Sequence, residues 1–132
     1  MIYLDACALV KLVRAEQYSE AMAAFISIAA SPVVSSELAR TEVHRTLWRN
    51  QEEAVVHKAA DRLLTQIAVL PLTAVIDSAG QLPHQHLRSL DALHLATALQ
   101  LGDNLSKFIS YDKRLAEAAR EQGLPALSPG AE

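Results

Sequence analysis

The stretch "MIYLDACALV", residues 1–10, joins a short apolar run to an aspartate and then to a helical pattern. Residues 1–4 are apolar or aromatic, which favours a buried strand. Asp5 follows directly, at a position where its carboxylate can cap a helix expected over residues 6–13. This order of strand, acid and helix is typical of the first unit of an α/β domain.

Strand and helix patterns alternate along the rest of the chain. The further strands are expected at 32–35, 68–72, 107–110 and 124–127. The helices are expected at about 17–30, 36–50, 52–67, from Thr73 to Pro83, and at 90–101 and 112–122, with Ser35 or Ser36, Thr73 and Ser89 as caps. This alternation predicts a Rossmann-like three-layer sandwich, in which helices flank both faces of a central, mostly parallel sheet. We expect a single domain over residues 1–132.

Composition narrows the class of protein. The chain has 132 residues, of which 51% are hydrophobic and 20% charged, enough for one buried core. Its single cysteine, Cys7, has no internal partner, which fits a reducing compartment. With no basic leader and no apolar run long enough to cross a bilayer, we expect a cytoplasmic protein without membrane contact. The net charge of -3 neither supports nor excludes a polyanionic substrate.

Acidic residues stand where ligands bind in such folds, beyond the carboxyl ends of the strands. Asp5 follows the first strand, and Asp112 follows "KFISY". Each could instead serve only as a helix N-cap. Asp91 begins the otherwise apolar helix "LDALHLATAL", where the helix dipole alone would favour an acid by about 0.3–1 kcal/mol.

Glu42 is a fourth candidate because of its position on a helical wheel. It falls within the arc formed by Leu38, Val43 and Leu47, so its carboxylate is expected to face the core or a cleft. The alternative is a salt bridge to Arg45, three residues on. Glu37 falls on the opposite side of this helix, and we expect it in solvent.

Four carboxylates in one cleft would repel one another, and some would bind protons at neutral pH. A divalent cation removes this difficulty, and both Mg²⁺ and Mn²⁺ prefer carboxylate and water oxygens as ligands. Such an ion lowers the pKa of a bound water and neutralises charge on a phosphate. The chemistry that the four acids predict is therefore phosphodiester hydrolysis.

The sequence resembles a PIN-domain ribonuclease of the VapC toxin type over nearly its whole length. The stretches that carry the resemblance are "MIYLDACALVKL", "SSELARTEVHRTLWR", "LRSLDALHLATALQL" and "FISYDKRLAEAAREQGL". The acidic quartet of that family falls on Asp5, Glu42, Asp91 and Asp112. The resemblance implies a PIN-like fold and a Mg²⁺- or Mn²⁺-dependent endoribonuclease that cleaves an RNA such as tRNA or rRNA. It also implies a homodimer, and a type II toxin inhibited by a VapB-type antitoxin.

Three residues are supporting candidates at this site. Cys7 stands where the family usually has Ser, Thr or Asn, and its alternative is a small buried hydrophobe. Ser110 matches a hydroxyl position of the family, and its alternative is a capping hydroxyl. Arg88 could meet an RNA phosphate, as could Arg45, Arg49, Lys113 and Arg114, although such residues are usually solvated charges.

Other residues carry weaker predictions. His84 and His86 lack the further ligands that a zinc site needs. His94 is expected to be a satisfied core histidine, with the orientation of a water as the alternative. Trp48 and Tyr111 could stack on RNA bases, with packing in the core or at an interface as the safer interpretation for Trp48. The helices near residues 17–30 and 54–67 could receive a partner helix or simply pack on the core.

Two other classes of function are open at this point. A phospho-accepting signalling domain also has acids at strand ends, but it needs a paired acidic cluster after the first strand, where this chain has only Asp5. A non-catalytic binding protein of the same fold would be expected to have lost one or more of the four acids, and all are present.

Overall fold

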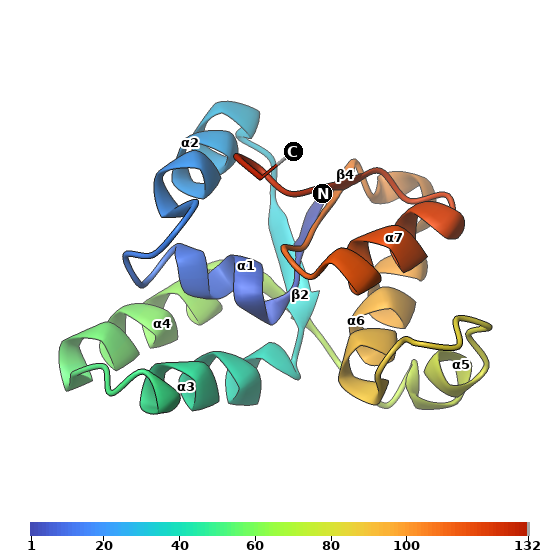
Figure 1. Cartoon of the computed structure of the whole chain (residues 1–132), viewed down its shortest axis with the longest axis horizontal. Helices are drawn as coiled ribbons and strands as arrows, with labels where there is room; N and C mark the ends of the chain where they lie inside the picture. The colour runs from blue at the N-terminus through green and yellow to red at the C-terminus, as the bar shows by residue number, and fades with distance from the viewer. Residues whose placement is uncertain (132) are drawn as a thin grey trace.

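The computed structural model describes residues 1–131 as five parallel strands between two layers of helices (Figure 1). The strands are β1 (Ile2–Leu4), β2 (Val33–Ser36), β3 (Ala68–Leu70), β4 (Lys107–Ile109) and β5 (Ala126–Leu127). Every strand pair is parallel, and the order across the sheet is β3-β2-β1-β4-β5. The predicted α/β sandwich is confirmed, with a sheet that is wholly parallel.

The helices divide between the two sides of the sheet (Figure 1). One side carries α1 (Ala6–Lys11), α2 (Ser19–Ala29), α3 (Ala39–Arg49) and α4 (Ala54–Gln66). The other carries α5 (Ile76–Gly80), α6 (Ser89–Leu99) and α7 (Lys113–Glu121), with a short 3₁₀ turn η1 (Gly102–Asn104) before β4. Within residues 1–131, no helix is both long and apolar enough to cross a membrane.

The strand order creates a switch point beside the central strand. From β1 the chain builds outward through β2 and β3, and it then returns to pair β4 with the opposite edge of β1, with Leu4 aligned to Ile109. The loops that follow β1 and β4 therefore leave in opposite directions and open a crevice between them. Open α/β sheets bind their ligands in this crevice.

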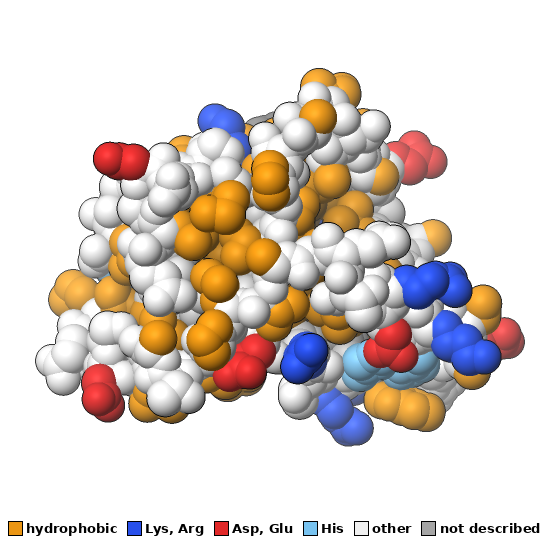
Figure 2. All heavy atoms as spheres, turned by 180° about the vertical axis from the view of Figure 1, so that it is seen from behind, with side chains coloured by type: hydrophobic (Ala, Val, Ile, Leu, Met, Phe, Trp, Pro, Cys, Tyr) orange, Lys and Arg blue, Asp and Glu red, His pale blue; other side chains and the backbone are white. Residues whose placement is uncertain are grey.

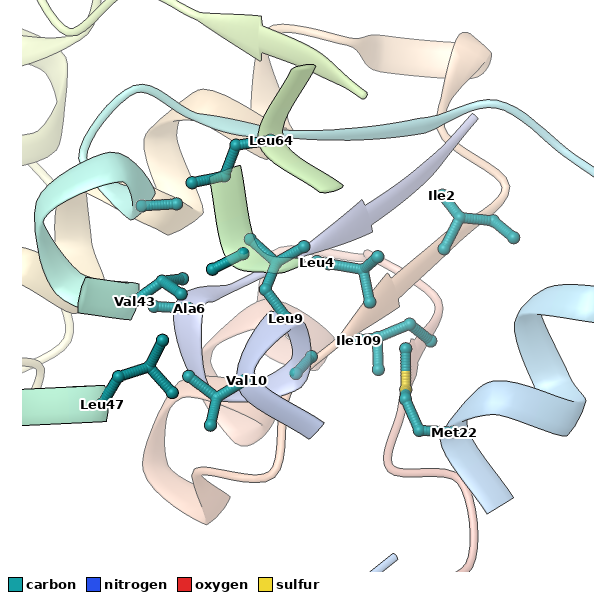
Figure 3. Close-up of a cluster of buried hydrophobic side chains, with 13 residues drawn as sticks. Ile2, Leu4, Ala6, Leu9, Val10, Met22, Val43, Leu47, Leu64 and Ile109 are labelled. Atoms are coloured by element: carbon teal, nitrogen blue, oxygen red, sulfur yellow. The ribbon is translucent and has the colours of Figure 1, made fainter. Parts of the chain in front are cut away.

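Alternating side chains of β1 connect the sheet to both helical layers. Ile2 and Leu4 pack with Leu9, Val43 and other apolar residues under α1 and α3, as Figure 3 shows. Tyr3 points to the opposite layer, where its ring stacks on Phe108 with the centroids 5.4 Å apart. Both layers thus depend on a strand of only three residues.

The expected helix caps are only partly correct. Ser36 Oγ accepts a hydrogen bond from the Leu38 amide, but α3 begins only at residue 39. Ser89 is the first residue of α6 and makes no cap, because the chain already turns into the helix at Arg88. The prediction for Thr73 is also wrong, since α5 begins at Ile76.

Glu37 corrects another expectation. It is partly buried, not in solvent, and its Oε1 accepts a hydrogen bond of 2.7 Å from the Leu72 amide. Because the chain has not yet entered α3 at this residue, the helical wheel did not apply to it. The contact joins the ends of β2 and β3, next to the crevice.

Replacing Leu9 by alanine tests the packing of α1 on the sheet. The Leu9 side chain is fully buried, so Leu9→Ala is expected to lower the free energy of unfolding by about 2–5 kcal/mol. Ile28→Ala is the control, because Ile28 is 84% exposed and its loss should cost within about 0.5 kcal/mol. Urea denaturation followed by circular dichroism measures both values. Equal losses would contradict the assignment of Leu9 to the core.

Candidate active site

A cleft of about 720 Å³ opens at the switch point, and the four predicted carboxylates all line it. They come from four elements: the end of β1, the first turn of α3, the first turn of α6 and the start of α7. The residues that line the cleft include Asp5, Cys7, Glu42, Arg45, Thr46, Arg49, Arg88, Asp91, His94 and Asp112.

Asp5 is the most buried of the four acids, with 4% of its surface exposed. As the N-cap of α1, its Oδ1 accepts a hydrogen bond of 2.9 Å from the Ala8 amide, and its Oδ2 accepts one from the Ser110 hydroxyl. Burial raises the pKa of Asp5 above its ordinary value, although the neighbouring His94 and these hydrogen bonds favour the charged form. The capping role is confirmed, and the second oxygen still faces the switch point.

Ser110 joins the two acids that follow the strands. Its hydroxyl donates to Asp5 and accepts a hydrogen bond of 3.1 Å from the Asp112 amide. Asp112 is the N-cap of α7, and its Oδ1 accepts a hydrogen bond from the Leu115 amide. The structure therefore gives Ser110 a positioning contact with both loops, beyond the capping role that was its alternative.

The position of Asp91 explains why an otherwise apolar helix has a carboxylate in its first turn. Its side chain keeps 22% exposure in the cleft, while Ala92 and Leu95 behind it are buried. Partial burial raises the pKa of Asp91, and the negative charges of Asp112 and Asp5 raise it further. Asp91 thus lies in a cluster of like charges, where a cation would stabilise its ionised form.

Arg88 is the cation placed nearest to this cluster. Its guanidinium lies 4.0 Å from Asp91 and 3.8 Å from Asp112, and 75% of the side chain is exposed. Such distant, exposed contacts stabilise the folded protein little. These contacts therefore do not fix the Arg88 side chain.

Glu42 does not make the predicted alternative contact with Arg45. Its Oε1 lies 2.6 Å from Nε2 of His94, and Nδ1 of the same ring lies 2.6 Å from the hydroxyl of Tyr3. His94 is buried with both nitrogens paired, as expected of a core histidine. Tyr3 was missed in the sequence, where the only signal was a hydroxyl within an apolar strand.

The donor set suits a hard divalent cation. Carboxylate oxygens from Asp5, Glu42, Asp91 and Asp112 border one water-accessible cleft. Burial raises the pKa values of Asp5 and Asp91, and the charges of Asp112 and Asp5 raise that of Asp91 further. Within residues 1–131, no three His, Cys, Asp or Glu side chains form a closed ligand set. Mg²⁺ does not require one, because it binds through one or two carboxylates and keeps several waters.

Comparison with known proteins assigns the family. The sequence pattern of the PIN domain matches residues 2–121. The chain belongs to the PIN-domain family. Ribonuclease VapC46 of Mycobacterium tuberculosis (strain ATCC 25618 / H37Rv) is 42% identical to this PIN domain over 129 residues, which cover 97% of each chain. Ribonuclease VapC47 of M. tuberculosis (strain CDC 1551 / Oshkosh) is 36% identical over 99% of this chain and 98% of its own. These relatives make it a VapC-type PIN domain.

Two solved structures share the fold. M. tuberculosis VapC20, described as a sarcin–ricin loop cleaving toxin, superimposes with a TM-score of 0.74 at 19% identity, covering 98% of this PIN domain and all of VapC20. FitAcB from Neisseria gonorrhoeae gives a TM-score of 0.70 at 18% identity over the full length of both chains. At these identities the likeness confirms the PIN-like fold and nothing finer.

Cys7 is the position where this PIN domain departs from its family's usual hydroxyl or amide. The residue is exposed at the cleft, so the buried-hydrophobe alternative is wrong. Its Sγ lies 3.3 Å from Asp5 Oδ1, as a weak donor to that carboxylate. Desolvation of the sulfur and the charge of Asp5 raise the pKa of the thiol, which disfavours a nucleophilic thiolate.

Some predicted residues lie outside the cleft of this PIN domain. Arg114 lines a separate pocket with His84 and His86, where His84 pairs with Glu121 at 2.8 Å. Lys113 does not line the cleft as the structure describes it.

The two aromatic candidates also lie elsewhere. Trp48 on α3 is 60% exposed, and its ring contacts the ring of His57 with the centroids 4.5 Å apart. The prediction that Trp48 packs in the core is therefore wrong. Tyr111 stacks on Tyr18, and its hydroxyl donates to the Pro129 carbonyl. Neither ring is placed to stack on a base bound in the cleft.

A cluster that the sequence did not predict lies on the outer side of α3 and α4. His44 contacts His57 through their Nδ1 atoms at 2.7 Å, and its Nε2 lies 2.7 Å from Asp61. Figure 2 shows histidine and acidic side chains together on the surface at this end of the molecule. The cluster is separate from the cleft, and no sequence signal links residues 44, 57 and 61.

The raised pKa of Asp91 predicts how stability depends on pH in the absence of metal. The folded protein binds this proton more tightly than the unfolded chain, so the contribution of Asp91 is full below its ordinary value of 3.8 and is lost as pH rises through the raised folded value. Asp91→Asn has no such loss, so its stability relative to the original protein should rise as the pH is raised above 3.8. Urea unfolding in EDTA measures the difference, and a constant difference over this range would contradict the prediction.

Proposed function

We propose that this PIN domain is a Mg²⁺- or Mn²⁺-dependent endoribonuclease that acts as the toxin of a type II toxin–antitoxin pair. The observation that carries the proposal is the convergence of four carboxylates at one cleft, where burial raises the pKa values of Asp5 and Asp91 and the charges of Asp112 and Asp5 raise that of Asp91 further. The names of the relatives, Ribonuclease VapC46 and VapC47, support RNA cleavage.

In the proposed reaction, Asp5, Asp91 and Asp112 would hold the cation directly or through water, and Glu42 would hold it or orient the attacking water. The cation would supply a nucleophilic water at neutral pH and neutralise charge on the scissile phosphate. Ser110 keeps Asp5 and the Asp112 loop in register through its two hydrogen bonds. Cys7 contributes a weak hydrogen bond to Asp5, which leaves the carboxylate charge less shielded than a hydroxyl would.

The proposed substrate is RNA, held by arginines on one wall of the cleft and at its rim. Arg45 and Arg49 extend from α3, one turn apart and next to Glu42, and Arg88 precedes α6. No carboxylate forms an ion pair with Arg45 or Arg49 within residues 1–131, so both are available to phosphates. We propose structured RNA such as rRNA or tRNA, because the neighbour VapC20 is described as a sarcin–ricin loop cleaving toxin.

The proposed protein partners are a VapB-type antitoxin and a second copy of this chain. Large apolar side chains are exposed on several helices, including Ile28 on α2, Trp48 on α3 and Val55 on α4. Figure 2 shows further apolar side chains gathered near the middle of one face. Such surfaces lose contact with water in a complex, which is the physical support for both partners.

The phospho-accepting alternative is weakened by the residues around Asp5. Such a domain needs a paired acidic cluster after the first strand, yet Asp5 is followed there by Ala6 and Cys7. The non-catalytic alternative predicts binding without cleavage, and the first experiment below separates it from the nuclease.

Purified protein free of antitoxin is expected to cleave total RNA into discrete products in Mn²⁺ or Mg²⁺, and EDTA should abolish the cleavage. Asp91→Asn should lower the rate by roughly 100-fold or more, as loss of several kcal/mol of metal-dependent stabilisation would. Asp103→Asn is the matched control, since Asp103 is exposed in η1 and outside the cleft. Cleavage that persists in Asp91→Asn would place the activity elsewhere, and a folded protein that binds Mn²⁺ without cleaving would favour the binding protein.

Replacing the arginines of the α3 wall tests the substrate. Arg49→Ala should raise KM for RNA and reduce the dependence of KM on salt, with a small effect on kcat, because a phosphate contact releases counterions when it forms. Arg40→Ala is the control, since Arg40 is exposed on the same helix but does not line the cleft. Steady-state cleavage of a fluorogenic RNA at two salt concentrations measures both. If the two variants behave alike, the α3 wall does not bind RNA.

A further inference from the structure

Among the four carboxylates, Glu42 is the one whose partner is a buried aromatic ring from another helix. Nε2 of His94 lies 2.6 Å from Glu42 Oε1, and Nδ1 lies 2.6 Å from the hydroxyl of Tyr3. Three side chains thus form a continuous chain of hydrogen bonds from β1, through α6, to α3. It begins in the core and ends at the cleft.

The chemistry of the Glu42 contact sets the direction of its hydrogen bond. A carboxylate oxygen accepts, so Nε2 of His94 donates to Oε1 of Glu42. The other ring nitrogen, Nδ1, is paired with the hydroxyl of Tyr3, which has no exposed surface. The ring is therefore held from its buried side while its Nε2 faces Glu42.

The anchor is also rigid. The Tyr3 ring stacks on Phe108 and meets the His94 ring edge to face, with centroids 5.9 Å apart. His94 is 1% exposed, so water cannot compete for either nitrogen. A carboxylate held in this way has lost the rotamer freedom that an exposed glutamate would keep.

We infer that His94 is a positioning residue that, held by Tyr3, fixes Oε1 of Glu42 and thereby reserves Oε2 for the ion or its bound water. The inference rests on the proposed function, because it concerns the same cleft. A histidine present only to fill the core would stabilise the fold without affecting how Glu42 acts. The two roles therefore differ in what they predict for metal affinity.

The test measures Mn²⁺ binding by electron paramagnetic resonance, with RNA cleavage against Mn²⁺ concentration in parallel. His94→Asn keeps a polar group near Tyr3 but cannot reach Glu42, and it should weaken Mn²⁺ binding about 10- to 100-fold. His94→Gln, whose amide nitrogen can donate to Glu42, should restore much of the loss. Leu95→Val is the control, because Leu95 is buried on the same helix away from the cleft and should lower thermal stability alone.

A double variant shows whether His94 acts through Glu42. If it does, Glu42→Gln combined with His94→Asn should bind Mn²⁺ no more weakly than Glu42→Gln alone. Separate, additive losses in the double variant would overturn the inference. So would unchanged Mn²⁺ binding in a folded His94→Asn protein.

Two further measurements depend neither on RNA cleavage nor on replacing His94. Nitrogen-15 spectra of the metal-free protein should show a proton on Nε2 of His94. Tyr3→Phe, which removes the hydroxyl that pairs with Nδ1, should weaken Mn²⁺ binding in the same direction as His94→Asn. An Nε2 without a proton in the original protein would overturn the inference. If no RNA is cleaved but Mn²⁺ binding follows the pattern above, the ribonuclease proposal fails and the positioning role of His94 stands.

Discussion

The structure depends on one buried charge, the carboxylate of Asp5 at the carboxyl end of the central strand. An unpaired carboxylate in this position would cost several kcal/mol. Two neighbouring segments satisfy it: the first turn of α1 through the Ala8 amide, and the loop after β4 through Ser110. The hydrogen bonds that make this charge tolerable therefore also bring the ends of β1 and β4 together.

Stability and function compete at this point of the fold. Burial raises the pKa values of Asp5 and Asp91, and the charges of Asp112 and Asp5 raise that of Asp91 further. Both effects destabilise the protein without metal, and apolar side chains at these positions would remove the cost at the expense of the site. The contacts from Arg88 and His94 reduce the free-energy cost of the clustered carboxylates without removing their negative charge. Arg88 stays at a distance from its two acids, whereas Glu42 is held closely by His94. The cleft thus holds Glu42 by a close contact from α6, whereas Arg88, just before α6, is only loosely paired.

Much of this could be predicted from the sequence, because the relevant signals are local. The parallel sheet follows from the alternation of short apolar runs with helical patterns, and Asp5 and Asp112 follow from their places after strands. Glu42 could be found because a carboxylate interrupts an apolar arc. The prediction failed at Ser89 and Glu37, where a shift in the start of a helix moves a side chain from one role to another. Contacts across the sheet, such as Tyr3 with His94, leave no local signal, because the two residues are 91 positions apart.

The order in which the chain is made has a consequence for this topology. Strands β1, β2 and β3 are neighbours in the sheet and can pair during synthesis, but β4 must add to the open edge of β1 before Ser110 and Asp112 reach Asp5. Partly synthesised or truncated chains that lack β4 therefore hold only part of the acidic cluster. For the proposed ribonuclease, this order means that the complete acidic cluster forms only when β4 docks, after most of the chain has been made.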